Sequence, residues 1–102
     1  MEPPYEEGWD FDGTMCYSPK GYYLRVYRTI EKIFPFITII LPVRAKPTNR
    51  NILIITASRN KIGVLAWLRL HNVKYKMIMF VRDFNDKKYF INKLCWRYTE
   101  IE

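Results

Sequence analysis

The chain has 102 residues, of which 49% are hydrophobic and 17% aromatic, which predicts one folded domain over residues 1–102 and excludes a disordered chain. Its 17 Lys and Arg outnumber its 10 Asp and Glu, for a formal net charge of +7. Half of these acids lie within the first 12 residues, so the rest of the chain is strongly basic. A basic body attracts phosphate-bearing partners such as nucleic acid, nucleotides or an acidic membrane surface, unless the charge serves solubility alone.

The apolar and cysteine patterns exclude two further classes. The longest apolar run, 33–43, is interrupted by two prolines and is too short to span a bilayer, so no transmembrane segment is expected. The N-terminus is acidic and lacks the apolar region of a secretory signal, which predicts a cytoplasmic protein. Cys16 and Cys95 have no C-x-x-C spacing and are accompanied by a single histidine, so reduced thiols are expected and a zinc site is not.

The first distinctive stretch, Trp9–Met15, places two aspartates two residues apart. On a strand, Asp10 and Asp12 would point the same way, about 6 to 7 Å apart at Cα, so something positive should lie between them. A hard cation such as Mg²⁺ meets that need. Gly13 can adopt a positive φ and turn the chain, and Thr14 adds a hydroxyl. The alternative is that Asp-Gly forms an ordinary hairpin turn.

The first half of the chain is harder to assign. Residues 1–8 are polar and proline-rich, a poor buried strand, although a short strand with Trp9 and Phe11 facing away from the aspartates is possible. Apolar residues at helical spacing predict a helix over 22–34. The segment 36–43 is interpreted as a helix or irregular apolar segment over the core, with an exposed docking patch as the alternative. A basic loop follows, with Arg44, Lys46 and Arg50, and is either solvated or tracks phosphates.

The second half alternates strands and helices. We expect a strand buried on both faces at 52–55, a helix over 62–70 closed by His71-Asn72, a buried strand at 76–81, a helix from Asn85 or Asp86 to Leu94, and a last strand at 97–101. This order is typical of a parallel α/β sheet, in which ligands bind at the carboxyl ends of the strands. Asp10, Asp12, Thr56 and the acids near Glu100 would all fall there.

The signature Asp10-Phe11-Asp12-Gly13-Thr14, followed by an apolar strand that ends in Thr56-Ala57-Ser58-Arg59, resembles the haloacid dehalogenase-like (HAD) hydrolase superfamily. Residues 52–80 are also similar to that family's second strand, helix and third strand. The resemblance implies an α/β fold, a Rossmann-like three-layer sandwich with a small, mainly parallel sheet. No insertion large enough for a cap domain is expected, which would leave the site open to bulky phosphoesters.

The resemblance also implies catalytic roles. Asp10 would be the nucleophile that forms an aspartyl-phosphate, and Asp12 the general acid and then base. Thr56 would hydrogen-bond a phosphate oxygen, although Thr56 or Ser58 could equally cap the next helix. Lys87 or Lys88 would offset the negative charge, although both could simply lie on a solvated helix face.

Substrate and metal binding follow in the same way from the resemblance. Substrate-binding residues would be Gly13, Thr14, Ser58 and Arg59. Mg²⁺ would be held by Asp10, by Asp12 through its backbone carbonyl, and by Glu100 and Glu102. The last two depart from the family pattern, because aspartates with more chain after them are usual there.

Two hypotheses of function result. The first is a Mg²⁺-dependent phosphatase that hydrolyses a phosphomonoester, with a nucleotide or a nucleic-acid end favoured. The second is a catalytically weak or inactive HAD-like basic module that binds nucleic acid or a protein partner. Such compactness would suit a viral or phage protein. The incomplete acidic tail favours the second hypothesis unless the chain is a fragment of a longer one.

Overall fold

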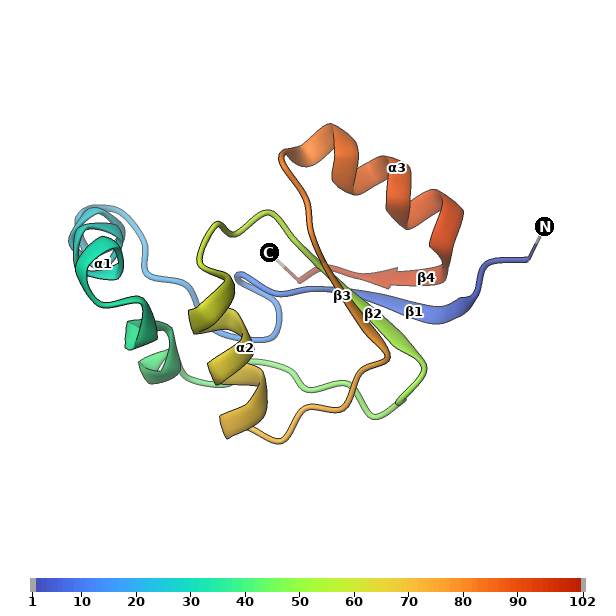
Figure 1. The fold of residues 1–102 in the computed structure, drawn as a ribbon, viewed down its shortest axis with the longest axis horizontal. Helices are drawn as coiled ribbons and strands as arrows, with labels where there is room; N and C mark the ends of the chain where they lie inside the picture. The colour runs from blue at the N-terminus through green and yellow to red at the C-terminus, as the bar shows by residue number, and fades with distance from the viewer. Residues whose placement is uncertain (1, 102) are drawn as a thin grey trace.

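The computed structural model describes residues 2–101 (Figure 1). This part of the chain contains four strands, three α-helices and a short 3₁₀ helix, joined by loops. In chain order they are β1 (Tyr5–Asp10), α1 (Tyr22–Ile33), η1 (Pro35–Ile40), β2 (Ile52–Thr56), α2 (Lys61–Leu70), β3 (Met77–Phe80), α3 (Phe84–Leu94) and β4 (Cys95–Thr99). This is the expected alternation of strands and helices in the second half of the chain, with boundaries shifted by at most two residues.

The four strands form one sheet in the order β3-β2-β1-β4, and every pair is parallel. The fold is therefore a Rossmann-like α/β fold with an all-parallel sheet, as the strand and helix pattern predicted. Asp10 lies opposite Ile55 of β2, and Trp9 lies opposite Thr99 of β4. The last residues of β1, β2 and β4 thus meet at one edge of the sheet, which faces α1 in Figure 1.

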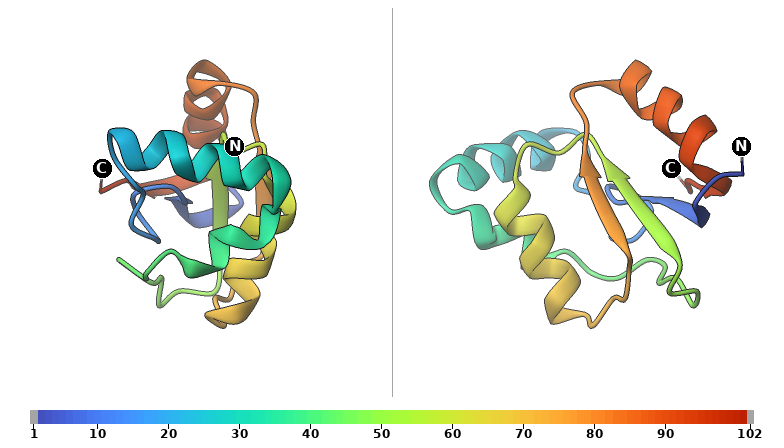
Figure 2. Two further views of the ribbon diagram at one scale, coloured as in Figure 1. Left: turned by 90° about the vertical axis from the view of Figure 1, so that its left-hand side faces the viewer. Right: turned by 45° about the vertical axis from the view of Figure 1, so that its right-hand side comes forward.

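Alternate residues of the central strands contact different helices. Ile52 and Ile54 belong to the apolar cluster that contains Trp67 and Leu68 of α2, whereas Leu53 and Ile55 belong to the cluster that α3 covers. Figure 2 shows α2 and α3 on different sides of the strands. Burial on both faces explains why β2 is a continuous apolar run.

The expectation that residues 1–8 make a poor buried strand holds in part: β1 begins at Tyr5 and lies between β2 and β4, yet its first three residues are not fully buried. Its polar residues are accommodated locally. The Glu7 carboxylate accepts a hydrogen bond of 3.0 Å from Trp9 Nε1 and lies 3.8 Å from Arg97. Gly8 allows β4 to approach, since a Cβ there would lie 2.6 Å from Cys95 Sγ. A central strand can therefore be half polar when its neighbours supply the partners.

Two other expectations are corrected at the two edges of the sheet, and a third, for the segment before β2, holds in part. The strand at β3 is only half-buried, and Met77 is exposed, because an edge strand has one neighbour instead of two. The last strand begins at Cys95 and ends at Thr99, two residues earlier than predicted. The segment 36–43 contains η1, of whose six residues only Thr38 is buried, whereas Leu41 and Val43 after η1 pack in the apolar core, so the segment covers the core only in part.

The segment 17–42, which contains α1 and η1, leaves and rejoins the body at one place. Cys16 bridges Val43, and the Tyr17 amide donates 3.0 Å to the Pro42 carbonyl. Gly63 lets α2 lie against η1, since a Cβ at that position would lie 2.5 Å from the Pro35 carbonyl oxygen. The segment 17–42 therefore lies on the carboxyl side of the sheet, next to the end of β1 (Figure 1).

Two simpler expectations also hold for residues 2–101. Both cysteines are unbonded and buried, which confirms free thiols. In this part of the chain, every helix is too short or too polar to cross a membrane.

Candidate active site

The carboxyl end of β1 carries a buried ion pair between residues 77 positions apart. Lys87 of α3 donates from Nζ to Asp10 Oδ1. Asp10 is 3% exposed and Lys87 is 6% exposed. The positive group expected beside the aspartates is thus a lysine of the chain itself. A buried carboxylate needs such a partner, since leaving either charge alone out of water is costly.

The turn after β1 supports the second oxygen of Asp10. The backbone of Phe11 accepts from the amides of Thr14, at 3.3 Å, and Met15, at 3.0 Å, and Gly13 adopts a φ of 77°. This tight turn brings the Thr14 hydroxyl back to Asp10 Oδ2, at 3.4 Å. The positive φ predicted for Gly13 is confirmed, and the turn is not the tip of a hairpin between paired strands, since β1 pairs with β2 and β4.

Phe11 and Asp10 point to opposite sides of the sheet. The Phe11 ring packs edge-on against Trp67 of α2, with centroids 5.2 Å apart, whereas Asp10 meets α3. This is the alternation expected of a strand. Asp12 is half-buried and forms a parallel bridge with Cys16 just beyond the strand.

Arg44 contacts the turn after β1, although the sequence indicated only that Arg44 lies in a basic loop. Its Nη1 donates 2.9 Å to the Gly13 carbonyl, and its guanidinium lies 5.2 Å from the centroid of the Tyr17 ring. A positive charge is thereby held beside the backbone of the two aspartates. The sequence carried no local signal for this contact, because Arg44 and Gly13 are 31 positions apart.

Thr56 ends β2 and is fully buried, one residue beyond the level of Asp10. Its Oγ1 accepts 3.1 Å from the Ser58 amide. The proposed capping role of Thr56 or Ser58 is wrong, because Asn60 caps α2 by accepting 3.0 Å from the Gly63 amide. Arg59 lies exposed in this loop. Asn60 was missed, although an asparagine directly before a helix is a common cap.

The two late lysines have different environments. Lys87 is buried on Asp10, and its Nζ also lies 5.8 Å from the centroid of the Tyr98 ring. Lys88 is exposed and lies over the Phe84 ring, at 5.0 Å. The helix begins earlier than predicted, at Phe84, because Asp83 caps it by accepting 3.0 Å from the Asp86 amide. This cap sets the helical register that points Lys87 at Asp10.

The acidic tail reaches the same edge of the sheet. The Ile101 amide donates 3.0 Å to the Thr14 hydroxyl, and the residues that follow the Trp9–Thr99 pair in register are Asp10 and Glu100. Glu100 is exposed, and Glu102 lies outside the described residues. Within residues 2–101, no three His, Cys, Asp or Glu side chains come together in a geometry that could hold a metal ion.

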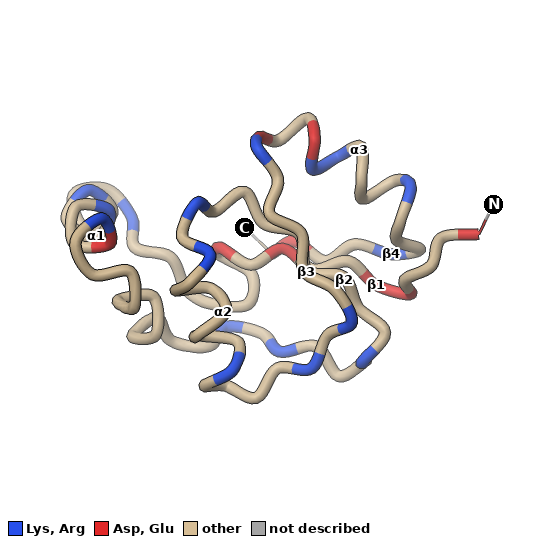
Figure 3. The backbone as a smooth tube through the Cα atoms, viewed as in Figure 1, with Lys and Arg blue, Asp and Glu red and all other residues tan. Residues whose placement is uncertain are grey.

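Charge is distributed unevenly around this edge. Figure 3 shows acidic segments at the carboxyl ends of the central strands and basic segments on the surrounding loops and helices. Cys16 lies beneath the turn, with its Sγ 3.8 Å from the Phe11 carbonyl. Burial, reinforced by the charge of Asp12, raises the pKa of the Cys16 thiol to about 12. Cys16 therefore stays protonated at neutral pH and is not a nucleophile.

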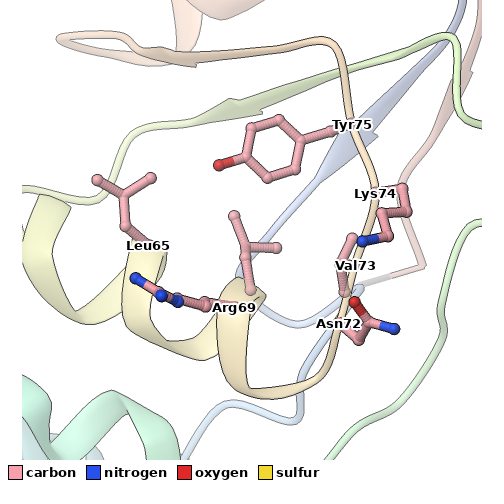
Figure 4. Close-up of a pocket in the computed structure, with 7 residues that line it drawn as sticks. Leu65, Arg69, Asn72, Val73, Lys74 and Tyr75 are labelled. Atoms are coloured by element: carbon pink, nitrogen blue, oxygen red, sulfur yellow. The ribbon is translucent and has the colours of Figure 1, made fainter.

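A concavity lies away from this edge of the sheet. A cavity of about 360 Å³ is formed by the end of α2 and the connection to β3, with Leu65 and Arg69 on one side and Tyr75 on the other (Figure 4). Its lining contains none of the predicted site residues. The structure thus brings together Asp10, Thr14 and Lys87, and places Asp12, Gly13, Thr56 and Glu100 at the same strand ends.

Comparison of the chain with protein-family models, with curated proteins and with solved structures gave no match.

Proposed function

We propose that the protein is a Mg²⁺-dependent phosphomonoester hydrolase of the HAD-like type that works through an aspartyl-phosphate on Asp10. The observation that carries the proposal is the buried pair of Asp10 and Lys87 at the carboxyl end of β1, with a second aspartate two residues later. In a parallel sheet this edge is where ligands bind. The family resemblance of the sequence and the all-parallel α/β fold support the proposal.

The two carboxylates can divide the chemistry. A carboxylate oxygen of Asp10 attacks phosphorus, a phosphorus–oxygen bond to the substrate breaks, and the leaving alkoxide takes a proton from Asp12. Asp12 then removes a proton from water, the resulting hydroxide attacks the aspartyl-phosphate, and inorganic phosphate leaves with the Asp10 carboxylate restored. Lys87 offsets the negative charge on Asp10 and on the transferring group throughout.

Neighbouring groups would position the phosphate. Thr56 Oγ1 already accepts a hydrogen bond from the Ser58 amide, so its own proton can be donated to a phosphate oxygen. Arg59 in the following loop supplies a positive charge. The fully buried Thr14, which joins Asp10 to the Ile101 amide, keeps the turn in place.

The donor set fits magnesium in kind. Asp10 Oδ2 accepts a long hydrogen bond of 3.4 Å from the Thr14 hydroxyl, and the Asp12 carbonyl and Glu100 add hard oxygen donors at the same strand ends. Asp10, Asp12 and Glu100 would therefore hold Mg²⁺, with Glu102 as a further ligand from the sequence pattern. When bound, the ion would supply neutralising charge for phosphoryl transfer.

The basic surroundings favour an anionic substrate. A net charge of +7 draws nucleotides or phosphorylated nucleic-acid ends toward the site, and a cytoplasmic location would give access to them. We accordingly propose a nucleotide or a 3′-phosphorylated DNA or RNA end as the substrate class to screen first.

The decisive experiment is hydrolysis of an aryl phosphate by the wild type, Asp10→Asn and Asp86→Asn, each with Mg²⁺ and with EDTA. Loss of the nucleophile should lower kcat by at least about a thousandfold. Asp86→Asn removes a carboxylate from the same side of the molecule without touching Asp10, and should retain turnover. Equal turnover by Asp10→Asn and the wild type would contradict the proposal.

Lysine variants test the charge-neutralising role. Lys87→Met should lose most activity, because the developing charge loses its buried partner, whereas Lys88→Met should not. Mass spectrometry of quenched reactions should place the phosphoryl group on Asp10.

One observation favours the alternative, an inactive basic binding module. Asp10 already has its charge balanced by Lys87, as a purely structural ion pair would. In that case Mg²⁺ would leave the melting temperature unchanged, and oligonucleotide binding would weaken steeply with salt. A hydrolase should instead be stabilised by Mg²⁺ in the wild type and less so in Asp10→Asn.

A further inference from the structure

The helix α1 is amphipathic, yet its apolar side is turned to solvent. At 3.6 residues per turn, six aromatic and aliphatic side chains fall on one arc of the helix and its C-cap, which we name the α1 apolar face: Tyr22, Tyr23, Val26, Ile30, Ile33 and Phe34. Ile33 is 83% exposed, and Tyr22 and Tyr23 are each 75% exposed. No residue of Tyr22–Ile33 is buried against the described part of the chain.

A different side of α1 holds it to the body. The Tyr27 hydroxyl shares a 2.9 Å hydrogen bond with Thr38 of η1, and Glu31 accepts 3.1 Å from the Asn60 side chain at the start of α2. Tyr27 and Glu31 are four residues apart and so share one stripe of the helix. The apolar face is therefore not needed to attach α1, which is unusual, because most helices bury their apolar side.

Basic residues border the α1 apolar face. Arg25, Arg28 and Lys32 lie on the remaining side of the helix, and all three are exposed. The helix has one acidic residue, Glu31, which is directed at Asn60. The exposed part of α1 thus combines apolar side chains, two tyrosines and positive charge alone.

The apolar surface continues beyond the helix. The Phe34 ring lies 6.1 Å from the Phe36 ring of η1, measured between centroids. Phe36 in turn lines an open groove of about 620 Å³ between η1 and α2, whose other walls are Ile39, Ile62, Leu65, Ala66, Arg69 and Leu70. Arg69 is the one charged residue in this lining. In the right-hand view of Figure 2, α1 and η1 lie apart from the strands of the sheet.

We propose that the α1 apolar face and the adjoining groove bind an anionic lipid surface, with Arg25, Arg28 and Lys32 contacting the headgroups. An exposed apolar arc, bordered by basic residues and containing tyrosines, suits the boundary between headgroups and acyl chains. A second copy of the chain fits less well, because a two-fold interface would bring the same three positive charges together without an acid to meet them. This inference does not depend on the proposed phosphatase activity.

Flotation with lipid vesicles tests the proposal. The wild type should bind vesicles of mixed phosphatidylcholine and phosphatidylserine and should bind pure phosphatidylcholine at least about tenfold more weakly, with the difference shrinking at high salt. Equal binding to both vesicles, or none to either, would overturn it.

Matched variants separate the surface from overall charge. Tyr23→Asn with Ile33→Asn should reduce binding at least about tenfold, whereas Tyr89→Asn, which removes an exposed aromatic from α3, should not. Arg25→Gln with Lys32→Gln should reduce binding roughly fivefold per charge removed. Lys88→Gln with Lys93→Gln lowers the net charge by the same amount but on α3. An equal loss of vesicle binding in that variant would contradict the proposal.

Light scattering without vesicles tests whether the surface binds a second copy of the chain instead. A monomeric wild type is expected. A dimer that Tyr23→Asn with Ile33→Asn converts to monomer would show that the surface joins two copies, and would overturn the lipid proposal. Circular dichroism of every variant should match the wild type, because the substituted side chains are exposed.

Discussion

The two faces of the sheet are covered by helices of similar length that are held in different ways. The helix α2 buries Gly63, Val64, Trp67 and Leu68, whereas α3 buries a single residue, the charged Lys87. The apolar residues that α3 directs at the sheet, Phe90, Ile91 and Leu94, are only partly buried. One face is therefore an apolar core, and the other has a buried charge where a core residue would be expected.

The difference teaches that the candidate site and the stability of α3 are coupled. Burial of apolar surface is non-directional and holds α2 whatever happens at the strand ends. A buried lysine is tolerated only while its partner is present. The position of α3 should thus respond to substitutions at Asp10, and that of α2 should not. The following predictions test this contrast, from the largest expected effect to the smallest.

Trp67→Ala should be the most destabilising change, by about 3 to 5 kcal/mol. Its indole donates 2.9 Å to the Leu41 carbonyl and packs on Phe11, so both a hydrogen bond and a large buried surface are lost. Phe90→Ala, on the α3 face, should be milder, about 1 to 2 kcal/mol, because Phe90 is only partly buried. Urea unfolding of both variants measures the contrast, and equal losses would contradict it.

Lys87→Met should lower the free energy of unfolding by about 3 kcal/mol, since it leaves the Asp10 carboxylate buried without its cation. Combining it with Asp10→Asn should recover most of that loss, because no unpaired charge remains. A double-mutant cycle on unfolding free energies gives the coupling. Lys88→Met is the control, and additive effects of Asp10→Asn and Lys87→Met would refute the coupling.

Alkaline pH should destabilise the protein through its buried thiols. Burial raises the pKa of Cys16 to about 12 and that of Cys95 to about 11, from 9.0 in each case. The folded state then binds protons more tightly than the unfolded state, so stability is full below pH 9 and falls as pH rises through the folded pKa values. The slope should be on the order of 1 kcal/mol per pH unit for each thiol.

Unfolding free energies at pH 8, 10 and 11 measure that slope. The variant Cys16→Ala should start less stable and lose less of its stability between these pH values. A slope that is the same in Cys16→Ala and the wild type would show that another group titrates there.

The smallest expected effect is a difference in alkylation rate between Cys16 and Cys95, which lie on opposite faces of the sheet. Cys16 lies in the apolar cluster with Trp67, and Cys95 lies in the cluster that α3 covers. Burial raises the pKa of Cys95 less than that of Cys16, which predicts more thiolate at Cys95 at pH 9 and therefore faster alkylation by iodoacetamide. Peptide mapping over time measures the two rates, and faster labelling of Cys16 would contradict the assignment.

Much of the architecture was predictable because local patterns matched the final fold. The continuous apolar run at Ile52–Thr56 is typical of a strand buried on both faces, and α1 and α2 show the apolar spacing of helices. The polar start of β1 did not reveal a central strand, because the neighbours of Glu7 and Gly8, Arg97 and Cys95, come from the other end of the chain. Exposure of β3 and η1 was also not predictable, since it depends on how many neighbours an element acquires.

The same division holds at the candidate site. The local sequence was enough to place Asp10, Asp12 and Gly13 at a strand end, because a strand followed by a tight turn depends only on neighbouring residues. The choice of Lys87 over Lys88 was decided by the tertiary structure, through the cap at Asp83 and the packing of α3 across 77 positions. Arg44 on Gly13 and Ile101 on Thr14 belong to the same class. Short-range geometry determines which groups leave a strand end, and only the packing of distant elements determines which charges meet them.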